Sequence, residues 1–546
     1  MGDVATLADD LLALIVQEDP LAEMVIGFPG SEDKLPDHSE SAEQELRAAA
    51  SAVMAAVPAD GGSDPITAAV VSQQAGALID RLDARLADHV MTDYSFAPAL
   101  RLLTILPLTR PADADAERAF FRRLAAVPGY LETVAERNRT GVAAGRLPVA
   151  DRAEHLVRHL DGYLADPAGD LLLRVPVADS AERDRLLLDV VRPAFARYRD
   201  VVAAEVVPRG RPADQPGLCW IPGGDSAYAG LVRMHTTTDR TPQELHDTGL
   251  ELIAALADEY VEIGSRAFGL HTLEEIRARL RSDPALRWGS AEEVLADATA
   301  AIERAETAAP RWFGLEPAHR CVLEPVPEVD APNAPSAYYL PATADGSRRG
   351  TYYVNTHQAT ERDRTVSEAT AFHEAVPGHH FQVSISQERV GLPALRRLAA
   401  INSFAEGWGL YSERLADEMG LYSDDVARLG MLGQDSVRAA RLVVDTGLHA
   451  FGWSRQQVVD HLRANTVMSE VEVQHETDRY IEAPGQALSY MVGRLEFQRI
   501  RARAAAALGE AFDVRAFHDV VLGGGTIPMD VLDRLVAAWT AEQTTR

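Results

Sequence analysis

The sequence has very few cysteines, since Cys219 and Cys321 are the only two among 546 residues. Two cysteines cannot form the disulfide framework of a small secreted domain, and neither lies near another thiol in the sequence, as a zinc–thiolate pair would require. Uncharged apolar runs are also short, and none approaches the length needed to cross a membrane. The sequence therefore argues against a disulfide scaffold and against a membrane-spanning protein.

Basic residues are scarce as well. The chain has 53 lysines and arginines against 82 acidic residues, which gives a net charge of −29. Nucleic acids and anionic membranes attract clustered Lys and Arg, so neither is an expected partner. The first thirty residues contain none of the lysine or arginine that opens a secretory signal. We therefore expect a soluble, cytoplasmic protein, for which a homodimer is possible.

Residues 1 to about 205 have the pattern of successive helices, because apolar residues recur three and four positions apart, as at Leu82, Leu86 and Val90. The stretch Pro208–Gly217 then holds three prolines and two glycines, which is the clearest change of composition in the chain. We predict a mainly α fold with a helical N-terminal subdomain over residues 1–207. The second subdomain, over residues 208–546, carries the chemistry.

Three short runs rich in β-branched and aromatic residues follow, at Cys321–Val326, Ala337–Leu340 and Thr351–Asn355. The polar segment 342–350 contains glycine and suits a hairpin connection between the last two runs. We predict a small antiparallel β-sheet over about residues 320–356. Its free edge could hold an extended peptide, with Tyr353 as a substrate contact, or it could be a purely structural hairpin.

The densest polar stretch of the chain has three histidines, a glutamate and a glutamine within ten residues from His373. Thr365 and Glu368 suit a capping box before it, so we predict a metal-binding helix over about residues 365–388. In a common zinc-hydrolase pattern, two histidines four residues apart on one helical face bind the metal, and the glutamate after the first activates water. Here Pro377, not a histidine, stands four residues after His373.

On an unbroken helix His379 would lie about 9 Å along the axis from His373, too far for both to bind one metal. Pro377 resolves this conflict, because a helical proline clashes with the carbonyl four residues earlier, which belongs to His373. Gly378 then permits backbone conformations that other residues resist. We predict a kink here that makes His379 the second ligand, with His380 supporting the site or facing the substrate. The spacing leaves open whether His379 or His380 is the ligand.

A catalytic zinc site needs a third protein ligand and keeps one position open for water. The segment Ser403–Glu413 supplies two glutamates on a predicted helix. Glu406 is the predicted ligand, because its glycine and aromatic neighbours let this helix approach closely, and Glu413 is expected to support the ligands. Alternatively, both are solvated surface carboxylates. A His/His/Glu set holds zinc, and it can also hold iron, manganese or cobalt.

Together with Trp220–Thr238, Arg438–His449 and Pro484–Tyr490, these motifs resemble a large, uncharacterised bacterial family of metallopeptidase-like proteins. The pattern is similar in turn to the helical gluzincins, the group of thimet oligopeptidase, angiotensin-converting enzyme and thermostable carboxypeptidases. This resemblance implies a two-lobed helical architecture with a deep cleft. The roles that it implies are metal ligation for His373, His379 and Glu406, general base for Glu374, and stabilisation of the oxyanion for Tyr490.

Further candidates surround this set. An arginine could bind a substrate carboxylate as a bidentate fork, although each one alone could be a surface residue. The arginines considered for this role are Arg438, Arg441 and Arg479. The residues that could support the ligands, besides Glu413, are Gln382, Asp445 and His449.

We expect a zinc-dependent hydrolase that cleaves amide bonds of short peptides, in a carboxypeptidase-like manner, with water activated by Glu374. An alternative is a metal-dependent biosynthetic enzyme that acts on a C–N or related bond of a small amino-acid-like metabolite. A third possibility is a binding module that has lost its activity, but the intact His/Glu set argues against it.

Overall fold

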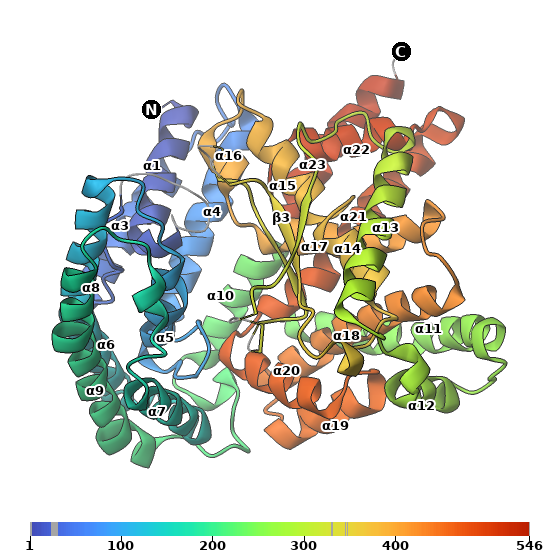
Figure 1. The fold of residues 1–546 in the computed structure, drawn as a ribbon. Coiled ribbons are helices and arrows are strands. Elements are labelled where there is room, and N and C mark those ends of the chain that lie inside the picture. The colour runs from blue at the N-terminus through green and yellow to red at the C-terminus, as the bar shows by residue number, and fades with distance from the viewer. Residues whose placement is uncertain are drawn as a thin grey trace.

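Helices make up most of the chain, and one small sheet lies among them (Figure 1). The structure, a computed structural model, describes residues 3–22, 31–328, 331–332, 334–343, 346 and 348–544. The prediction of a mainly α protein is confirmed. None of the helices in these ranges is long and apolar enough to cross a membrane.

The helices of the N-terminal part contribute to two separate cores. Those of α5–α9 enclose a core of their own, with Phe120, Leu131 and Phe195 at its centre, and they stack at the left of Figure 1. By contrast, Leu11 of α1 and Val70 of α4 pack into the main core of the C-terminal part. The bounds are α1 (Val4–Glu18), α3 (Glu40–Ala56), α4 (Pro65–Asp83), α5 (Pro98–Ile105), α6 (Ala114–Ala143), α7 (Ala150–Ala165), α8 (Ser180–Leu186) and α9 (Arg192–Val201). The boundary proposed at residue 208 stays a prediction.

The C-terminal part surrounds a buried helix, α17, whose Phe404 and Trp408 are fully enclosed. Around it, α14, α15 and α21 contribute to the same main core. The bounds are α10 (Gly224–Thr236), α11 (Pro242–Phe268), α12 (Leu273–Ser282), α13 (Ala291–Ala308), α14 (Ser367–Glu374), α15 (His379–Glu388), α16 (Ala394–Leu398), α17 (Asn402–Glu418), α18 (Asp425–His449), α19 (Arg455–Asn465), α20 (Glu470–Glu482), α21 (Ser489–Leu508), α22 (Val514–Gly523) and α23 (Met529–Thr544).

The sheet consists of β1 (Val322–Pro325), β2 (Ala337–Leu340) and β3 (Thr351–Val354), in the order β1-β3-β2. The predicted antiparallel pairing of β2 and β3 is confirmed, but β3 runs parallel to β1. The sheet is therefore mixed and the prediction of an antiparallel sheet is wrong, because the chain inserts its last strand between the first two. The connection expected over residues 342–350 lies partly outside the described residues.

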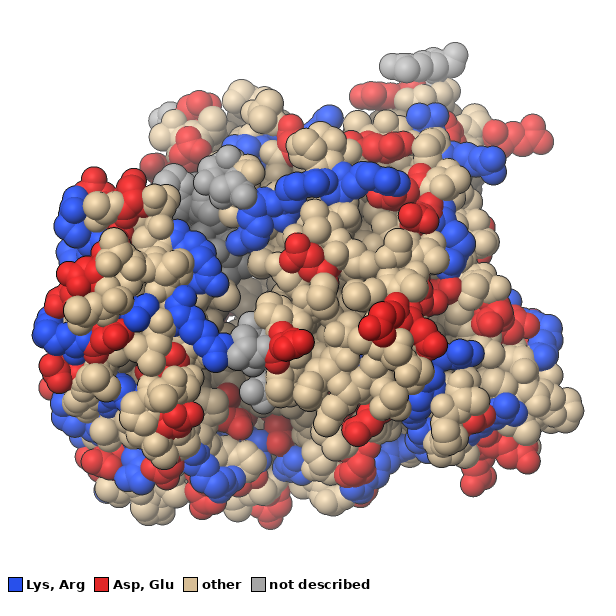
Figure 2. Space-filling model, in the orientation of Figure 1, with Lys and Arg blue, Asp and Glu red and all other residues tan. Residues whose placement is uncertain are grey.

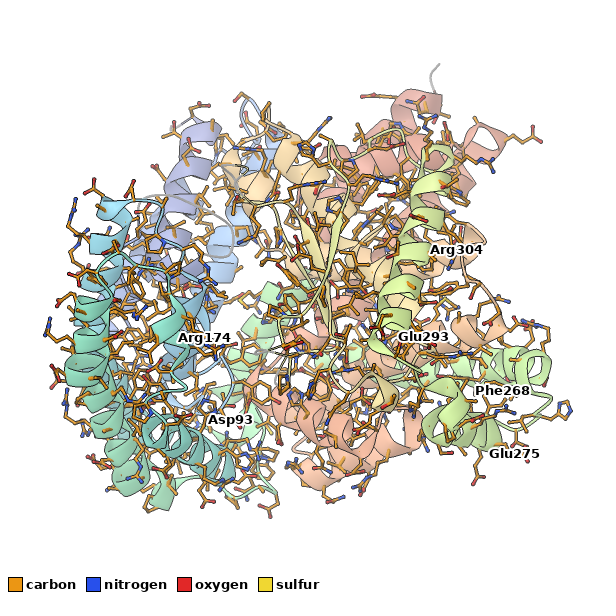
Figure 3. All side chains as sticks on the ribbon, viewed as in Figure 1. Asp93, Arg174, Phe268, Glu275, Glu293 and Arg304 are labelled. Carbon is orange, nitrogen blue, oxygen red and sulfur yellow. The ribbon has the colours of Figure 1, made fainter. Side chains whose placement is uncertain are left out.

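The helix α14 begins at Ser367, and the capping box predicted at Thr365 and Glu368 is not formed. Glu368 instead accepts a hydrogen bond from Arg304 of α13 at 2.5 Å and one from the backbone N–H of Ser423 at 2.9 Å. Arg304 is labelled on α13 in Figure 3. A tertiary ion pair thus replaces the local cap and ties the start of α14 to its neighbours.

Candidate metal centre

The predicted kink is a full interruption between two helices. The helix α14 ends at Glu374 and α15 begins at His379, with a cis peptide bond between Val376 and Pro377. The imidazole rings of His373 and His379 consequently meet with their centroids 4.7 Å apart and nearly perpendicular, at 88°. A straight helix through Gln382 would have contradicted the prediction.

The side chains of α17 hold this interruption in place. Trp408 Nε1 donates a hydrogen bond to the carbonyl of Pro377 at 2.8 Å, and Ser412 Oγ donates to the same carbonyl at 3.3 Å. Gly378 lies so close to α14 that a Cβ atom there would stand 1.9 Å from the carbonyl oxygen of His373. Only glycine therefore fits at the point where the chain turns back.

Gly378→Ala is expected to lower the free energy of unfolding by about 3 kcal/mol or more and to weaken metal binding, because the added methyl group meets rigid backbone. The matched control is Gly391→Ala, where a Cβ atom would meet nothing within 4 Å. Urea unfolding and metal content check both variants. Equal stability of the two would show that the chain does not pass so close to His373.

Three candidate ligand atoms converge at the interruption. Glu406 Oε2 on α17 lies 3.6 Å from His373 Nε2 and 3.3 Å from His379 Nε2. In a tetrahedral site with bonds of 2.0–2.1 Å, two ligand atoms are about 3.3–3.4 Å apart. The spacing of this donor set therefore fits a zinc-sized ion.

Glu374 belongs to the same cluster, since its carboxylate and the ring nitrogens of His373 and His379 lie within 4.8 Å of one another. Two carboxylates thus compete for the role of ligand. Glu406 contacts both imidazoles, which favours it as the ligand and leaves Glu374 for proton transfer.

Glu413 stands behind His373. Its Oε1 lies 2.8 Å from His373 Nδ1 and its side chain is buried, which is the arrangement that orients a metal-binding histidine. The helix α17 approaches closely because Gly409 faces the ring, and a Cβ atom there would lie 2.6 Å from His373 Cε1.

The charges of the cluster favour a cation. Burial alone would lower the pKa of His373, but the carboxylates of Glu406 and Glu413 outweigh it and raise that pKa. Burial alone would raise the pKa of Glu406, but the two imidazoles bring it well below its usual range. Three carboxylates around two imidazoles leave a negative charge that a divalent cation would offset.

Tyr490, at the start of α21, closes the other side of the cluster. Its ring is stacked on His373 with the centroids 6.5 Å apart and an angle of 23°. Arg441 and Arg438 of α18 lie over the same ring, at 4.7 and 5.8 Å from its centroid, and Arg479 Nη2 is 3.5 Å from its hydroxyl oxygen. The predicted arginines therefore gather around Tyr490.

Comparison with known proteins places the chain in a family. Its residues 20–536 match the family described as "Bacterial protein of unknown function (DUF885)". The chain belongs to this family. No curated protein matches it.

Two solved structures share the fold. A putative lipoprotein from Colwellia psychrerythraea is 24% identical, with a TM-score of 0.91 over 99% of each chain. A putative lipoprotein of unknown function from Shewanella oneidensis is 16% identical, with a TM-score of 0.73 over 98% of this chain and 100% of that one. Both names contradict the cytoplasmic location expected from the sequence, because lipoproteins are attached to membranes, and that expectation is withdrawn.

Asp445 of this DUF885 protein holds the loop that leads to Tyr490. Its carboxylate accepts hydrogen bonds from the Tyr228 hydroxyl at 2.6 Å and from the Gly485 N–H at 3.1 Å. His449, one turn further along α18, accepts from the Leu218 N–H at 3.2 Å and contacts the Tyr480 carbonyl at 2.9 Å. Both residues support the site from a distance.

The pH dependence of stability should report on Asp445, because burial raises its pKa from 3.8 to about 7. The folded protein then keeps a proton that the unfolded chain releases near pH 4, so the contribution of Asp445 to the free energy of unfolding falls as the pH rises from about 4 to about 7. Asp445→Asn mimics the protonated acid, so the variant should lack this pH-dependent loss of stability, which amounts to at most about 4 kcal/mol.

Unfolding by urea at pH 5 and pH 8 tests this expectation, with Asp460→Asn at an exposed position of α19 as the control. His449 acts in the opposite direction, because burial lowers its pKa to about 4 and only the unfolded chain binds its proton near pH 5. The Asp445 effect is therefore measured as the difference between Asp445→Asn and the wild type. If Asp445→Asn and the wild type lose equal stability between the two pH values, Asp445 is ionised in the folded protein.

Three of the predicted residues point elsewhere. His380 is buried and bonded to the Tyr339 hydroxyl at 3.2 Å and to the His319 carbonyl at 2.9 Å, so it does not face a substrate. Gln382 donates from Nε2 to Thr526 Oγ1 at 3.3 Å. Tyr353 stacks on Tyr338 with the ring centroids 5.1 Å apart, on the sheet face opposite the buried Tyr352.

Sequence reasoning missed two residues of the site. Glu476 of α20 accepts hydrogen bonds from Arg441 at 2.8 Å and from Arg479 at 3.1 Å. The spacing of Glu476 and Arg479, three residues apart on a helix, was a usable signal for that pair.

The second is Tyr352, whose pKa is raised mainly by burial and next by the nearby carboxylate of Glu374. In the sequence, the alternation of side chains along the strand did not show whether Tyr352 or Tyr353 faces the core.

A cavity of about 930 Å³ lies elsewhere, between α4, α10, α21 and α23. Several of its charged residues pair with one another, as Asp80 does with Arg233 at 2.7 Å and Glu496 with Arg499 at 2.8 Å. None of the candidate metal ligands lines it.

Proposed function

We propose that the protein is a metal-dependent hydrolase that cleaves amide bonds of short peptides, with zinc as the metal. The observation that carries the proposal is the convergence of His373, His379 and Glu406 beside a further carboxylate, Glu374. Iron, manganese or cobalt could take the place of zinc in this donor set. When bound, zinc polarises a carbonyl oxygen and lowers the pKa of a water molecule toward neutrality.

Glu374 moves the protons in this proposal. Its carboxylate takes a proton from the attacking water and gives it to the nitrogen of the leaving amine. As the last residue of α14, directly after the ligand His373, it is held beside the site. Its side chain is only half-buried, which supports access by water and substrate.

Tyr490 stabilises the charge that develops on the scissile carbonyl, by donating a hydrogen bond from its hydroxyl to the oxyanion. The guanidinium groups of Arg441 and Arg479 lie against its ring and its hydroxyl. They favour negative charge at this point, which supports the assignment.

The architecture in this proposal is that of the helical gluzincins, two helical lobes with a deep cleft between them. Glu406 lies on α17, and only the short α16 separates this helix from the histidine-bearing α14 and α15. A carboxylate on a following helix supports this relationship. The surface is hollowed between the left-hand helices and the rest of the molecule on the face in Figure 2, which also agrees with it.

The test is incubation of zinc-loaded protein with a mixed library of dipeptides and oligopeptides, followed by measurement of new amines. Cleavage is expected with zinc and not after chelation. One-to-one zinc binding without any cleavage would refute the peptidase and leave the alternative, an enzyme acting on a C–N bond of a small amino-acid-like metabolite. Failure to bind zinc would refute both.

A further inference from the structure

The arginines around Tyr490 form a local excess of positive charge in a protein whose net charge is −29. Three guanidinium groups, those of Arg438, Arg441 and Arg479, lie within contact of one ring or its hydroxyl. The carboxylate that pairs with members of this group is Glu476. The group therefore carries more positive charge than its carboxylate partner neutralises.

Two of the three arginines are already committed to protein partners. Arg441 donates from Nη2 to Glu476 at 2.8 Å and from Nε to the Tyr480 hydroxyl at 2.9 Å. Arg479 donates to Glu476 at 3.1 Å and from Nη2 to Gln486 Oε1 at 2.8 Å. These contacts hold both side chains in fixed positions against Tyr490.

Arg438 is different. Within the described part of the chain it has no carboxylate partner within 4.0 Å. Its Nη1 atom donates a hydrogen bond to the Gln434 carbonyl of its own helix, at 3.5 Å. Its side chain is half-buried, and its Nε atom is enclosed without a hydrogen-bond partner. A partly desolvated guanidinium without a counter-ion is unfavourable, and an anion of the substrate would satisfy it as a bidentate fork.

Arg438 is also close to the reacting groups. The Tyr490 ring that it covers is stacked on the ligand His373. In a substrate cleaved at its last amide bond, the terminal carboxylate lies about one residue, ~3.8 Å, beyond the scissile bond. A carboxylate held at Arg438 therefore suits an amide placed between the metal ligands and Tyr490.

We propose that Arg438 binds a substrate carboxylate located one residue beyond the scissile amide, as in a peptide with a free C-terminus or an N-acyl amino acid. This inference rests on the proposed function and deepens it, because it makes the enzyme an exo-acting hydrolase that releases a single amino acid. Arg441 and Arg479 are positioning residues, which hold Tyr490 and shape the space beside Arg438.

The experiment compares N-acetylated dipeptides, one set as free acids and one as C-terminal amides, with N-acetylated amino acids as a third set. The wild type should prefer acids over amides by about 10- to 100-fold in kcat/KM, the usual effect of a hydrogen bond to a charged group. Arg438→Gln should bring this ratio to about one, mainly through KM, and Arg438→Lys should restore part of it. Faster hydrolysis of the dipeptides would indicate peptides with a free C-terminus as the substrate, and faster hydrolysis of the N-acetylated amino acids would indicate N-acyl amino acids.

Arg428→Gln is the matched control, since Arg428 lies on the same helix but pairs with Asp417 at 2.8 Å. It should keep the wild-type ratio. Zinc content and the melting temperature show whether each variant is folded. Equal loss of acid and amide hydrolysis in Arg438→Gln, or no preference in the wild type, would overturn the inference.

Binding separates this inference from the proposed function. Calorimetry with N-acetylated amino acids, as acids and as amides, needs no turnover. Binding of acids that Arg438→Gln abolishes, in a protein that cleaves nothing, would keep the carboxylate subsite and refute the hydrolase. Cleavage of acids and amides at equal rates would refute the subsite and keep the hydrolase, and neither binding nor cleavage would refute both.

Discussion

His379→Ala is expected to abolish one-to-one zinc binding, whereas His380→Gln is expected to leave it intact. His379 Nε2 lies 3.3 Å from Glu406 Oε2, at the spacing of two zinc ligands. His380 is the next residue of α15 but is bonded to Tyr339 and His319, away from the cluster. Elemental analysis after dialysis measures the zinc content of both variants.

The same pair should differ in thermal stability. Zinc at about a thousand times its dissociation constant would raise the free energy of unfolding of the wild type by about 4 kcal/mol, because the ion binds the folded protein and not a preformed site in the unfolded chain. His379→Ala should lose this increase and His380→Gln should keep it. Zinc retained by His379→Ala but lost by His380→Gln would mean that α15 presents the other histidine to the metal.

The break in the helix predicted to bind a metal could itself be predicted from the sequence, because its cause is local. Pro377 conflicts with the carbonyl of His373 whatever surrounds it. The two histidines that the metal hypothesis assigns to one ion lie on either side of it. The choice between His379 and His380 could not be made in the same way. It depends on how α15 is rotated after the interruption, and Trp408 and Ser412 of a later helix fix that rotation.

The sheet shows the same division between local and tertiary information. The composition of the three runs was enough to predict strands, and the glycine-containing connection was enough to pair β2 with β3. The position of β3 between β1 and β2 depends on pairing between residues about thirty positions apart. The sequence does not show which face of the sheet packs on the core, so it could not decide whether Tyr352 or Tyr353 is the buried residue.

Side-chain partners were the least predictable part of the site. Thr365 and Glu368 have the spacing of a capping box, but Glu368 pairs with Arg304, which precedes it by 64 residues. The three arginines looked equivalent in the sequence. Only their partners separate Arg438 from Arg441 and Arg479, and those partners come from α20 and the loop before α21.

Glu374→Gln is expected to lower kcat for peptide hydrolysis by about 10²- to 10⁴-fold, the usual contribution of a general base, while zinc remains bound. Glutamine has nearly the same shape as glutamate but cannot accept the proton of the attacking water. Glu406→Gln should instead weaken zinc binding, because Glu406 Oε2 contacts both imidazoles. Initial rates at saturating substrate and zinc content, measured on the same preparations, give both quantities.

The comparison of these two variants decides between the two carboxylates of the cluster. Glu374 lies within the same 4.8 Å group of ligand atoms as the two histidines, so its geometry alone would also allow it to bind the metal. If it were the ligand, Glu374→Gln would lose zinc together with activity and Glu406→Gln would keep zinc. Glu361→Gln, an exposed position at the end of a short helical turn before α14, controls for the loss of a nearby carboxylate and should change neither quantity. Retained zinc with lost turnover in Glu374→Gln alone would assign proton transfer to Glu374.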